Sequence, residues 1–350
     1  MKIAIDCRMI GSGGIGSYIT ALLPFFTENH QCILFGNPEN LEKFKNDKTE
    51  IVECSVKTFS LKELFAFPKF FSRKINECDI YYTPYCNIPS GIKIPVYSTI
   101  HDVVFLDVPG LASKTGCIIR KLFYQYAVLR SKLIFTVSEF SKQRIISNLH
   151  CKKNIVVTYN AVPDWFYSSQ SQNIQIEKEN SILFVGNIKK HKGLSVLVEA
   201  FIAAKKQGFS AQLKIVGNSE NFRTADESIF QKIQTAPENS IVFTGRISDE
   251  ELKILYRTTK CLIQPSFYEG FGMPPMEAMS LGTNAIISDI PVFKEIYEKF
   301  PVIYFKTGDS EDLCKKLLSI DSEKLQNVFF PEIYSFEKTF NIINENIKNF

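Results

Sequence analysis

The sequence predicts an α/β protein made of two doubly wound domains, each built on a parallel sheet. Its 350 residues exceed the usual size of one domain. Short apolar segments alternate with longer amphipathic ones along the whole chain, which is typical of parallel α/β sheets. A polar stretch, residues 168–180, interrupts the series and is expected to be a linker. We therefore expect one domain over residues 1–167 and a second over 168–332.

The strand candidates fall into two series. The first comprises Lys2–Asp6, Cys32–Gly36, Ile51–Val56, Asp79–Thr83, Val96–His101, Leu133–Ser138 and Ile155–Asn160. The second comprises Ser181–Gly186, Gln212–Gly217, Ile241–Gly245, Cys261–Pro265, Asn284–Ser288 and Val302–Phe305. Residues 333–350 have helical apolar spacing, and we expect this helix to pack back on the first domain.

Composition sets broad limits on function. Apolar residues make up 45% and charged residues 22%, as in ordinary globular proteins, and the net charge of +4 by itself favours neither nucleic acid nor lipid. The nine cysteines form no C-x-x-C pair and are expected to be reduced, buried thiols. With no signal-peptide pattern and no run of eighteen apolar residues, we expect a cytoplasmic protein, either free or peripheral on the cytosolic face of a membrane.

The most specific motif is PSFYEGFGMPPMEAM, residues 265–279, which follows a strand candidate. Its glycines let the backbone approach a ligand closely, and a helix start near Pro274 offers N–H groups to phosphate. Glu269 and Glu277 could accept hydrogen bonds from the hydroxyls of two sugar rings at the carboxyl ends of the strands. The alternative is a surface loop with a solvated helix face.

This stretch resembles the E-x7-E motif of retaining glycosyltransferases of family 4, which have the GT-B fold: two Rossmann-like domains facing across a cleft. In that family the first glutamate contacts donor-sugar hydroxyls and the second binds the nucleotide ribose. The loop amides between them contact sugar and phosphate. The resemblance therefore implies donor-binding roles for Glu269, Gly270, Phe271, Gly272, Met273 and Glu277.

A second motif, SILFVGNIKKHKGLSVLVEAF, ends its strand at Gly186 and places Lys192 just before a helix. A lysine there can neutralise a diphosphate whose charge grows as the sugar leaves. The segment is similar to the family's G-R-L-x-x-x-K-G, which implies the diphosphate role for Lys192. Taken without the resemblance, bases in such a pattern are more often a solvated charge cluster.

The family's arginine is replaced here by Asn187. A second cation must then come from another base or be absent, and the candidates are His191, Lys189, Lys190 and Arg246. Selectivity for the nucleotide base is expected around Gly217 and around residues 245–247, so that Arg246 and Ile247 join the donor-binding set together with Gly186, Asn187 and His191.

Near the N-terminus, Gly11, Gly13 and Gly16 form a G-x-G-x-x-G pattern. It comes several residues after its strand, and the next strand ends in Gly36 without an acid for a ribose, so an NAD-dependent oxidoreductase is the weaker interpretation. The segment instead resembles the family's loop over the donor phosphates and the acceptor entrance. Those roles pass to three consecutive residues, Gly13, Gly14 and Ile15. A structural glycine turn stays open.

His101 and Asp102 follow a strand candidate, at an edge where ligands bind. They resemble the family's H-D segment, in which the histidine contacts the donor sugar near the reacting centre. Ser138, with Ser141, is expected to cap the next helix, and Asp102 and Ser138 are assigned to the acceptor side. The resemblance thus implies catalytic roles for His101, Lys192 and Glu269.

The implied reaction is retaining hexosyl transfer without a cofactor or a metal ion, and no D-x-D pair occurs in the chain. The donor is expected to be GDP-, UDP- or dTDP-linked, with mannose from GDP-mannose as the first choice. The acceptor would be a cell-surface glycan or a lipid-linked saccharide, and no nucleic-acid partner is expected. A non-catalytic glycan- or nucleotide-binding relative is the alternative.

Two segments, residues 61–74 and 114–132, mix aromatic with basic residues. Basic amphipathic helices of this kind can lie on an anionic membrane surface. Equally, the aromatics could belong to the core and the bases to a solvated face. The sequence leaves both interpretations open.

Overall fold

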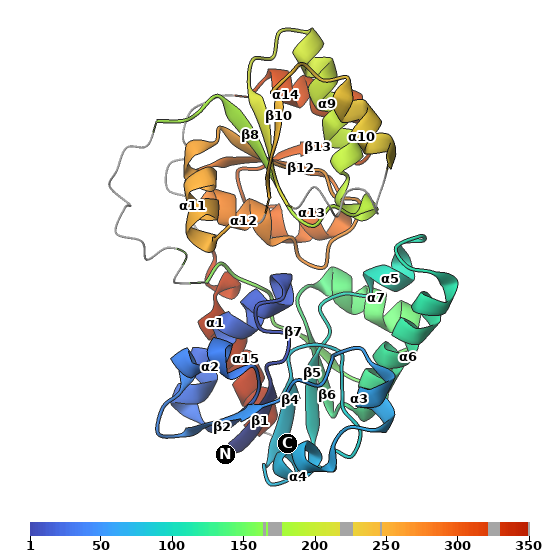
Figure 1. Ribbon diagram of the computed structural model, residues 1–350, viewed down its shortest axis with the longest axis vertical. Coiled ribbons are helices and arrows are strands. Elements are labelled where there is room, and N and C mark those ends of the chain that lie inside the picture. The colour runs from blue at the N-terminus through green and yellow to red at the C-terminus, as the bar shows by residue number, and fades with distance from the viewer. Residues whose placement is uncertain (164–165, 167–176, 218–226, 246, 321–329, 349–350) are drawn as a thin grey trace. The chain divides into compact units, whose positions relative to one another are not determined.

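The computed structural model describes residues 1–163, 166, 177–217, 227–245, 247–320 and 330–348. The chain divides into two compact units, Met1–Asn160 with Pro331–Phe350 (unit 1) and Ala161–Phe330 (unit 2) (Figure 1). The expected linker at 168–180 lies mostly outside the described residues. Among the helices that are described, none combines the length and apolarity needed to cross a bilayer.

Unit 1 is built on a seven-stranded parallel sheet in the order β3-β2-β1-β4-β5-β6-β7. The strands are β1 (Lys2–Asp6), β2 (Gln31–Gly36), β3 (Thr49–Glu53), β4 (Ile80–Thr83), β5 (Val96–Thr99), β6 (Leu133–Thr136) and β7 (Ile155–Val157). Most of their residues are buried, and β4, β5 and β6 are buried throughout, as expected for parallel strands covered on both faces. The strand order reverses between β1 and β4, and ligands bind at such a point in open α/β sheets.

The helices of unit 1 are α1 (Gly13–Asn29), α2 (Pro38–Leu41), η1 (Glu42–Phe44), α3 (Leu61–Phe65), α4 (Lys69–Ile75), α5 (Val104–Asp107), α6 (Lys114–Arg130), α7 (Glu139–Leu149), η4 (Glu332–Tyr334) and α15 (Phe336–Lys348). Helix α15 packs on α1. The ring of Phe340 stacks on Phe25 at 5.7 Å and meets Phe26 edge-on at 5.1 Å. Asn344 Oδ1 lies 2.8 Å from Nε2 of His30. The last helix thus supplies part of the core of the first unit.

A buried polar cluster fixes α3 to the end of β1. The guanidinium of Arg8, with only 3% of its side chain exposed, forms ion pairs with Asp6 and Glu63. Tyr81 donates to Asp6 at 2.6 Å, and Asn87 donates to Glu63 at 2.6 Å. Burial raises the pKa of Glu63 even though Arg8 lies beside it. Because both carboxylates share one guanidinium, α3 is held in place through Glu63.

Unit 2 is built on a six-stranded parallel sheet in the order β10-β9-β8-β11-β12-β13. The strands are β8 (Ser181–Val185), β9 (Gln212–Val216), β10 (Ile241–Gly245), β11 (Cys261–Gln264), β12 (Asn284–Ser288) and β13 (Ile303–Phe305). The helices are η2 (Lys190–Lys192), α9 (Leu194–Lys206), α10 (Glu227–Gln234), α11 (Asp249–Thr258), α12 (Met273–Ser280), α13 (Pro291–Tyr297) and α14 (Ser310–Leu318). Helices α9 and α14 pack on one another over the central strands (Figure 1).

The predicted doubly wound α/β class is confirmed, and every expected strand is present. Several strands end one to three residues before their expected limits, because the polar and glycine residues at these ends already belong to loops. The strand that was expected to run to Ser138, for example, ends at Thr136. All nine cysteines are free thiols and eight are buried, as predicted.

Candidate functional site

The loop that carries Lys192 is packed backbone to backbone against the loop after β11. Gly193 has a φ of +68°, and a Cβ built there would lie 1.8 Å from the carbonyl oxygen of Pro265. The amide of Phe267 donates to the carbonyl of His191 at 2.8 Å. A residue without a side chain is therefore required at position 193. This contact brings the two sequence motifs together.

Lys192 and Glu269, which were predicted separately, are bonded to each other. The ammonium Nζ lies 2.7 Å from Oε1 and 2.6 Å from Oε2 of Glu269. Oε1 also accepts from Ser266 at 2.7 Å and from Gln264 at 3.2 Å. Glu269 is buried and the Lys192 side chain is 19% exposed. Glu269 is thus held in one orientation, while the lysine reaches the surface of the loop.

Helix α12 begins at the glycine loop, as the sequence predicts. Gly272, its N-cap, has a φ of +89°, and a Cβ built there would lie 2.3 Å from the ring of Phe293. Tyr297 donates to the Gly272 carbonyl. The helix starts at Met273 with proline in its first turn. Gly270 and Phe271 are buried in the loop before it, and their contact with a donor stays a prediction.

The second glutamate of the motif, Glu277, is paired with a tyrosine of the neighbouring helix. Tyr256, fully buried on α11, donates its hydroxyl to Oε2 of Glu277 at 2.7 Å. Figure 1 shows α11 beside α12. Burial raises the pKa of Glu277 to about 7, against the lowering effect of this hydrogen bond. The protein thereby fixes Oε2 of Glu277. Oε1, the other oxygen of this carboxylate, takes no part in that hydrogen bond.

The sequence did not single out Tyr256, Gln264 or Ser266 as functional residues. Tyr256 belongs to the apolar stripe of α11, a pattern that predicts core packing alone. Gln264 offered a weak signal, since it is the polar residue that ends a fully buried strand. Only the fold brings these groups to the two glutamates.

Of the candidates for a second cation, His191 is unfavourable. Its burial, together with the charge of Lys192, lowers the pKa of His191 to about 4, so that the imidazole is neutral at neutral pH. Lys189 and Lys190 are exposed on the same turn, beside exposed Asn187. Arg246 lies outside the described residues. Lys189, Lys190 and Arg246 therefore remain the candidates for the second charge.

The carboxyl ends of β8, β9 and β10 bring the other predicted donor residues to one edge. Gly186 follows β8, and Gly217 donates its N–H to the carbonyl of Gly245 at 3.2 Å. Gly217 has a φ of +154° and Gly245 of +74°. Ile247, two residues on, is half-buried. These residues share an edge with Lys192 and Glu269 because all the strands are parallel.

In unit 1, the predicted residues also lie at the carboxyl ends of the strands. The predicted glycine loop follows β1 and turns into α1 at Gly13, which has a φ of +56°. Gly14 and Ile15 lie in the first turn, and a Cβ on Gly14 would meet nothing within 4 Å. Gly16 is different, because its Cβ would lie 2.7 Å from the amide nitrogen of Gly11. Packing therefore requires a glycine at position 16. At Gly13 and Gly14, in contrast, no other atoms crowd the start of the helix.

His101 is a neutral, oriented imidazole. Burial lowers its pKa to about 4. Its Nε2 lies 2.9 Å from the carbonyl oxygen of Pro84, an acceptor only, so Nε2 carries the proton and Nδ1 is the acceptor. The ring meets Tyr18 of α1 edge-on at 4.8 Å. Next to it, Asp102 accepts from the amide of Val104 at 3.0 Å.

Ser138 caps α7, as predicted, accepting from the amide of Ser141 at 3.0 Å. Its side chain is fully buried. The capping role is therefore confirmed. An acceptor-side role remains a prediction.

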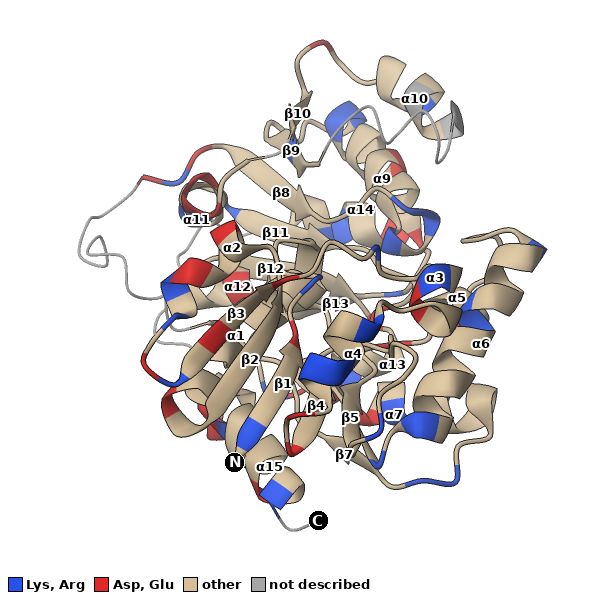
Figure 2. Ribbon diagram, turned by 60° about the horizontal axis from the view of Figure 1, so that its bottom comes forward, with Lys and Arg blue, Asp and Glu red and all other residues tan. Residues whose placement is uncertain are grey.

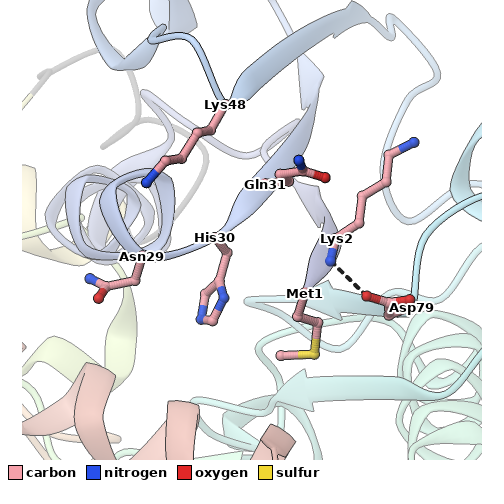
Figure 3. A pocket seen from close by; sticks show the side chains of 7 residues that line it. All are labelled: Met1, Lys2, Asn29, His30, Gln31, Lys48 and Asp79. Carbon is pink, nitrogen blue, oxygen red and sulfur yellow. Dashed lines mark hydrogen bonds between the residues drawn. The ribbon is translucent and has the colours of Figure 1, made fainter.

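A separate pocket of about 420 Å³ opens at the other edge of the first sheet (Figure 3). It is lined by Met1, Lys2, Asn29, His30, Gln31, Lys48 and Asp79. The amide of Lys2 donates to Asp79 at 2.7 Å, as Figure 3 shows. These residues lie at the amino ends of β1 and β2, away from the edge that carries the predicted site. Across the described ranges, no group of three or more His, Cys, Asp or Glu could hold a metal ion.

Comparison with known proteins relates most of unit 2 to a known family. Residues 168–329 match the family model of the glycosyl transferases group 1. The O-antigen chain mannosyltransferase RfbU of Salmonella typhimurium is 33% identical over 57% of this chain and 53% of its own length. The O-antigen chain mannosyltransferase B of Escherichia coli is 26% identical over 62% of this chain and 58% of its own length. The chain thus spans little more than half the length of these curated relatives.

The fold is shared with a solved structure over the whole chain. The HepE protein of Anabaena, in complex with UDP-glucose, superposes with a TM-score of 0.72 at 16% identity, covering 100% of both chains. This likeness confirms the two-unit α/β architecture that the sequence predicted.

Proposed function

Since residues 168–329 of this chain belong to the glycosyl transferases group 1, we propose that the protein is a retaining hexosyltransferase that uses a sugar nucleotide without a metal ion. The proposed donor is GDP-mannose, in preference to UDP- or dTDP-linked sugars. The proposed acceptor is a cell-surface glycan or lipid-linked saccharide at the cytosolic face of a membrane. The names of the two O-antigen mannosyltransferase relatives support this choice.

The contact between Lys192 and Glu269 is the observation that carries the proposal. An ammonium group has three N–H donors, and two of them suffice for the two oxygens of Glu269. The third can donate to a phosphate oxygen without breaking the pair. Oε2 of Glu269, which among the described residues accepts from Lys192, keeps one lone pair for a sugar hydroxyl. One lysine–glutamate pair can therefore hold a diphosphate and the adjoining sugar at the same time.

In the proposed step, the acceptor hydroxyl oxygen attacks the anomeric carbon on the face from which the diphosphate departs. The bond from that carbon to the phosphate oxygen breaks as the new glycosidic bond forms. The departing phosphate oxygen takes the hydroxyl proton. Lys192 and the amides at the start of α12 stabilise the negative charge on the leaving group. Nδ1 of His101 can accept a hydrogen bond from a donor-sugar hydroxyl.

The test is a panel of GDP-mannose, UDP-glucose and dTDP-glucose incubated with the protein, with mass spectrometry of the released nucleoside diphosphate. We expect hydrolysis or transfer with GDP-mannose, at the same rate in excess EDTA. Loss of turnover in EDTA would contradict a metal-independent reaction. No turnover and no thermal stabilisation with any donor would instead indicate a binding relative without activity.

A further inference from the structure

Two neighbouring parts of unit 1 expose large apolar side chains that a folded core would normally cover. The exposed side chains are Leu61 and Phe65 on α3, Phe70 on α4, and Ile118, Leu122 and Leu129 on α6. We call the surface that carries them the apolar–basic surface. Phe65 is 80% exposed, Leu129 72% and Phe70 66%. Single exposed apolar residues are common, but six on three adjoining helices are not.

Contacts made by the residues next to these helices bring the three helices close together. The ring of Phe59, just before α3, lies 5.9 Å from that of Phe123 on α6. Arg130, at the end of α6, donates to the carbonyl of Ile92 at 2.6 Å, and α4 packs on the preceding Gly91 through Ser72. Figures 1 and 2 both show α3 beside α6.

The exposed side chains stand on a fixed scaffold. Helix α3 is short, yet Glu63 in its middle is fully buried and paired with Arg8. On α6, Phe123, Tyr124 and Ala127 are buried in the core. The exposed stripe of α6, Ile118–Leu122–Leu129, follows helical spacing on the other side of that helix. The apolar exposure is therefore a property of the folded unit.

Basic residues surround these side chains. Segments 57–75 and 112–132 together contain ten Lys and Arg but one acidic residue, Glu63, which is buried. Lys62, Lys69 and Arg73 are exposed among the apolar residues of α3 and α4, and Lys114 and Lys121 are exposed on α6. Figure 2 shows Lys and Arg on all three helices.

We propose that the apolar–basic surface binds a lipid bilayer that carries anionic headgroups. The apolar side chains enter the boundary between headgroups and acyl chains, while the lysines lie at the level of the lipid phosphates. A second copy of the chain fits this surface poorly, because an isologous contact would bring two basic patches together. A nucleic acid would match the charge but leave the aliphatic side chains exposed to water.

Vesicle co-sedimentation tests this proposal without donor or acceptor, so its outcome is independent of the proposed transfer reaction. The probes are vesicles of phosphatidylcholine alone and of phosphatidylcholine with phosphatidylglycerol in about equal parts. The wild-type chain should sediment with the anionic vesicles only, and less so as salt rises. Lys62→Gln with Lys121→Gln should weaken binding at least about tenfold, since each base near an anionic surface contributes roughly fivefold.

Phe65→Ser with Leu122→Ser should weaken binding to a similar extent while keeping the charge. Matched controls on other surfaces are Ile254→Ser, 57% exposed on α11, and Lys315→Gln with Lys338→Gln; these should bind as wild type. Equal binding by all variants, or no wild-type binding, overturns the proposal.

Two further outcomes would assign the surface to another occupant and also overturn the proposal. One is self-association in analytical ultracentrifugation that Phe65→Ser abolishes. The other is binding to a single-stranded oligonucleotide that the two lysine changes weaken while the anionic vesicles are ignored.

Discussion

The hydroxyl of Tyr256 donates to Oε2 of Glu277 at 2.7 Å, and this joins α11 to the helix of the glycine loop. The bond stabilises the charged carboxylate, while burial opposes it and raises the pKa of Glu277 to about 7. If Glu277 accepts hydrogen bonds from a ribose, its protonation state controls nucleotide affinity near neutral pH.

We therefore expect GDP affinity to rise as the pH increases from about 6 to 8, because the ionised carboxylate is the better acceptor. Tyr256→Phe removes the hydrogen bond, so the pKa of Glu277 rises further and the midpoint moves to higher pH. Isothermal titration at several pH values measures this. Tyr304→Phe, which removes a tyrosine hydroxyl bonded at 3.1 Å to a carbonyl of the same unit, should leave the midpoint in place. If the pH midpoint for GDP binding is unchanged in Tyr256→Phe, the titration of Glu277 does not control nucleotide affinity.

The same group makes stability depend on pH. Because the folded pKa of Glu277 is raised, the native state binds more protons than the unfolded state between its ordinary value of 4.5 and about 7. The stabilisation that Glu277 gives to the folded state is complete below this pH window and is lost as the pH rises through it. Glu277→Gln should flatten this decline by roughly 2–3 kcal/mol, at about 1.4 kcal/mol per pKa unit. Urea unfolding at pH 5 and pH 8 tests the sign; a steeper decline in the variant would refute it.

Lys192→Ala should lower the rate of transfer by about 10²–10³, the range found when one preorganised donor to a developing anion is removed. The measurement is release of nucleoside diphosphate under saturating donor. Lys206→Ala, an exposed lysine at the end of α9, is the matched control and should stay within a few-fold of wild type. Equal rates for the two variants would remove Lys192 from the proposed mechanism.

Gly193→Ala should destabilise the protein by about 2–5 kcal/mol, from the left-handed backbone and from the clash with the Pro265 carbonyl. It should also reduce transfer, because the loops that carry Lys192 and Glu269 must separate. Gly14→Ala, in the open first turn of α1, should change stability by less than about 1 kcal/mol. Urea midpoints of the two variants give the comparison. An unchanged free energy of unfolding in Gly193→Ala would show that the two loops can move apart without cost.

His101 should act without titrating in the working range, since its pKa of about 4 keeps the ring neutral. Between pH 5.5 and 8, the pH–rate profile should show no inflection that is due to His101. His101→Asn should lower kcat by about 10–100-fold without removing an inflection from the profile. A pH–rate profile of both proteins decides the matter. An inflection near pH 6.5 that is lost in the variant would show that the imidazole becomes charged.

The sequence predicted the strands well because each is a short apolar run bounded by glycine or polar residues, a local signal. It also singled out Glu269, Glu277 and Lys192 as candidate site residues, since each stands in a motif next to a strand end. It could not predict that Lys192 and Glu269 are bonded, because 77 residues separate them and only the pairing of β8 with β11 brings their loops together. Tyr256 was missed for a different reason: its helical spacing marks a core residue, and its hydroxyl adds nothing to that pattern.

Helix α15 covers Phe25 and Phe26 of α1 with side chains that are synthesised after the whole of unit 2. The first unit is therefore discontinuous, with all of the second unit inserted between its two parts. On the ribosome, residues 161–330 can complete their own sheet before α15 has been synthesised to cover the aromatic face of α1. The core of the first unit is consequently completed only after unit 2 has been synthesised, and the nascent chain carries an exposed aromatic surface until α15 emerges.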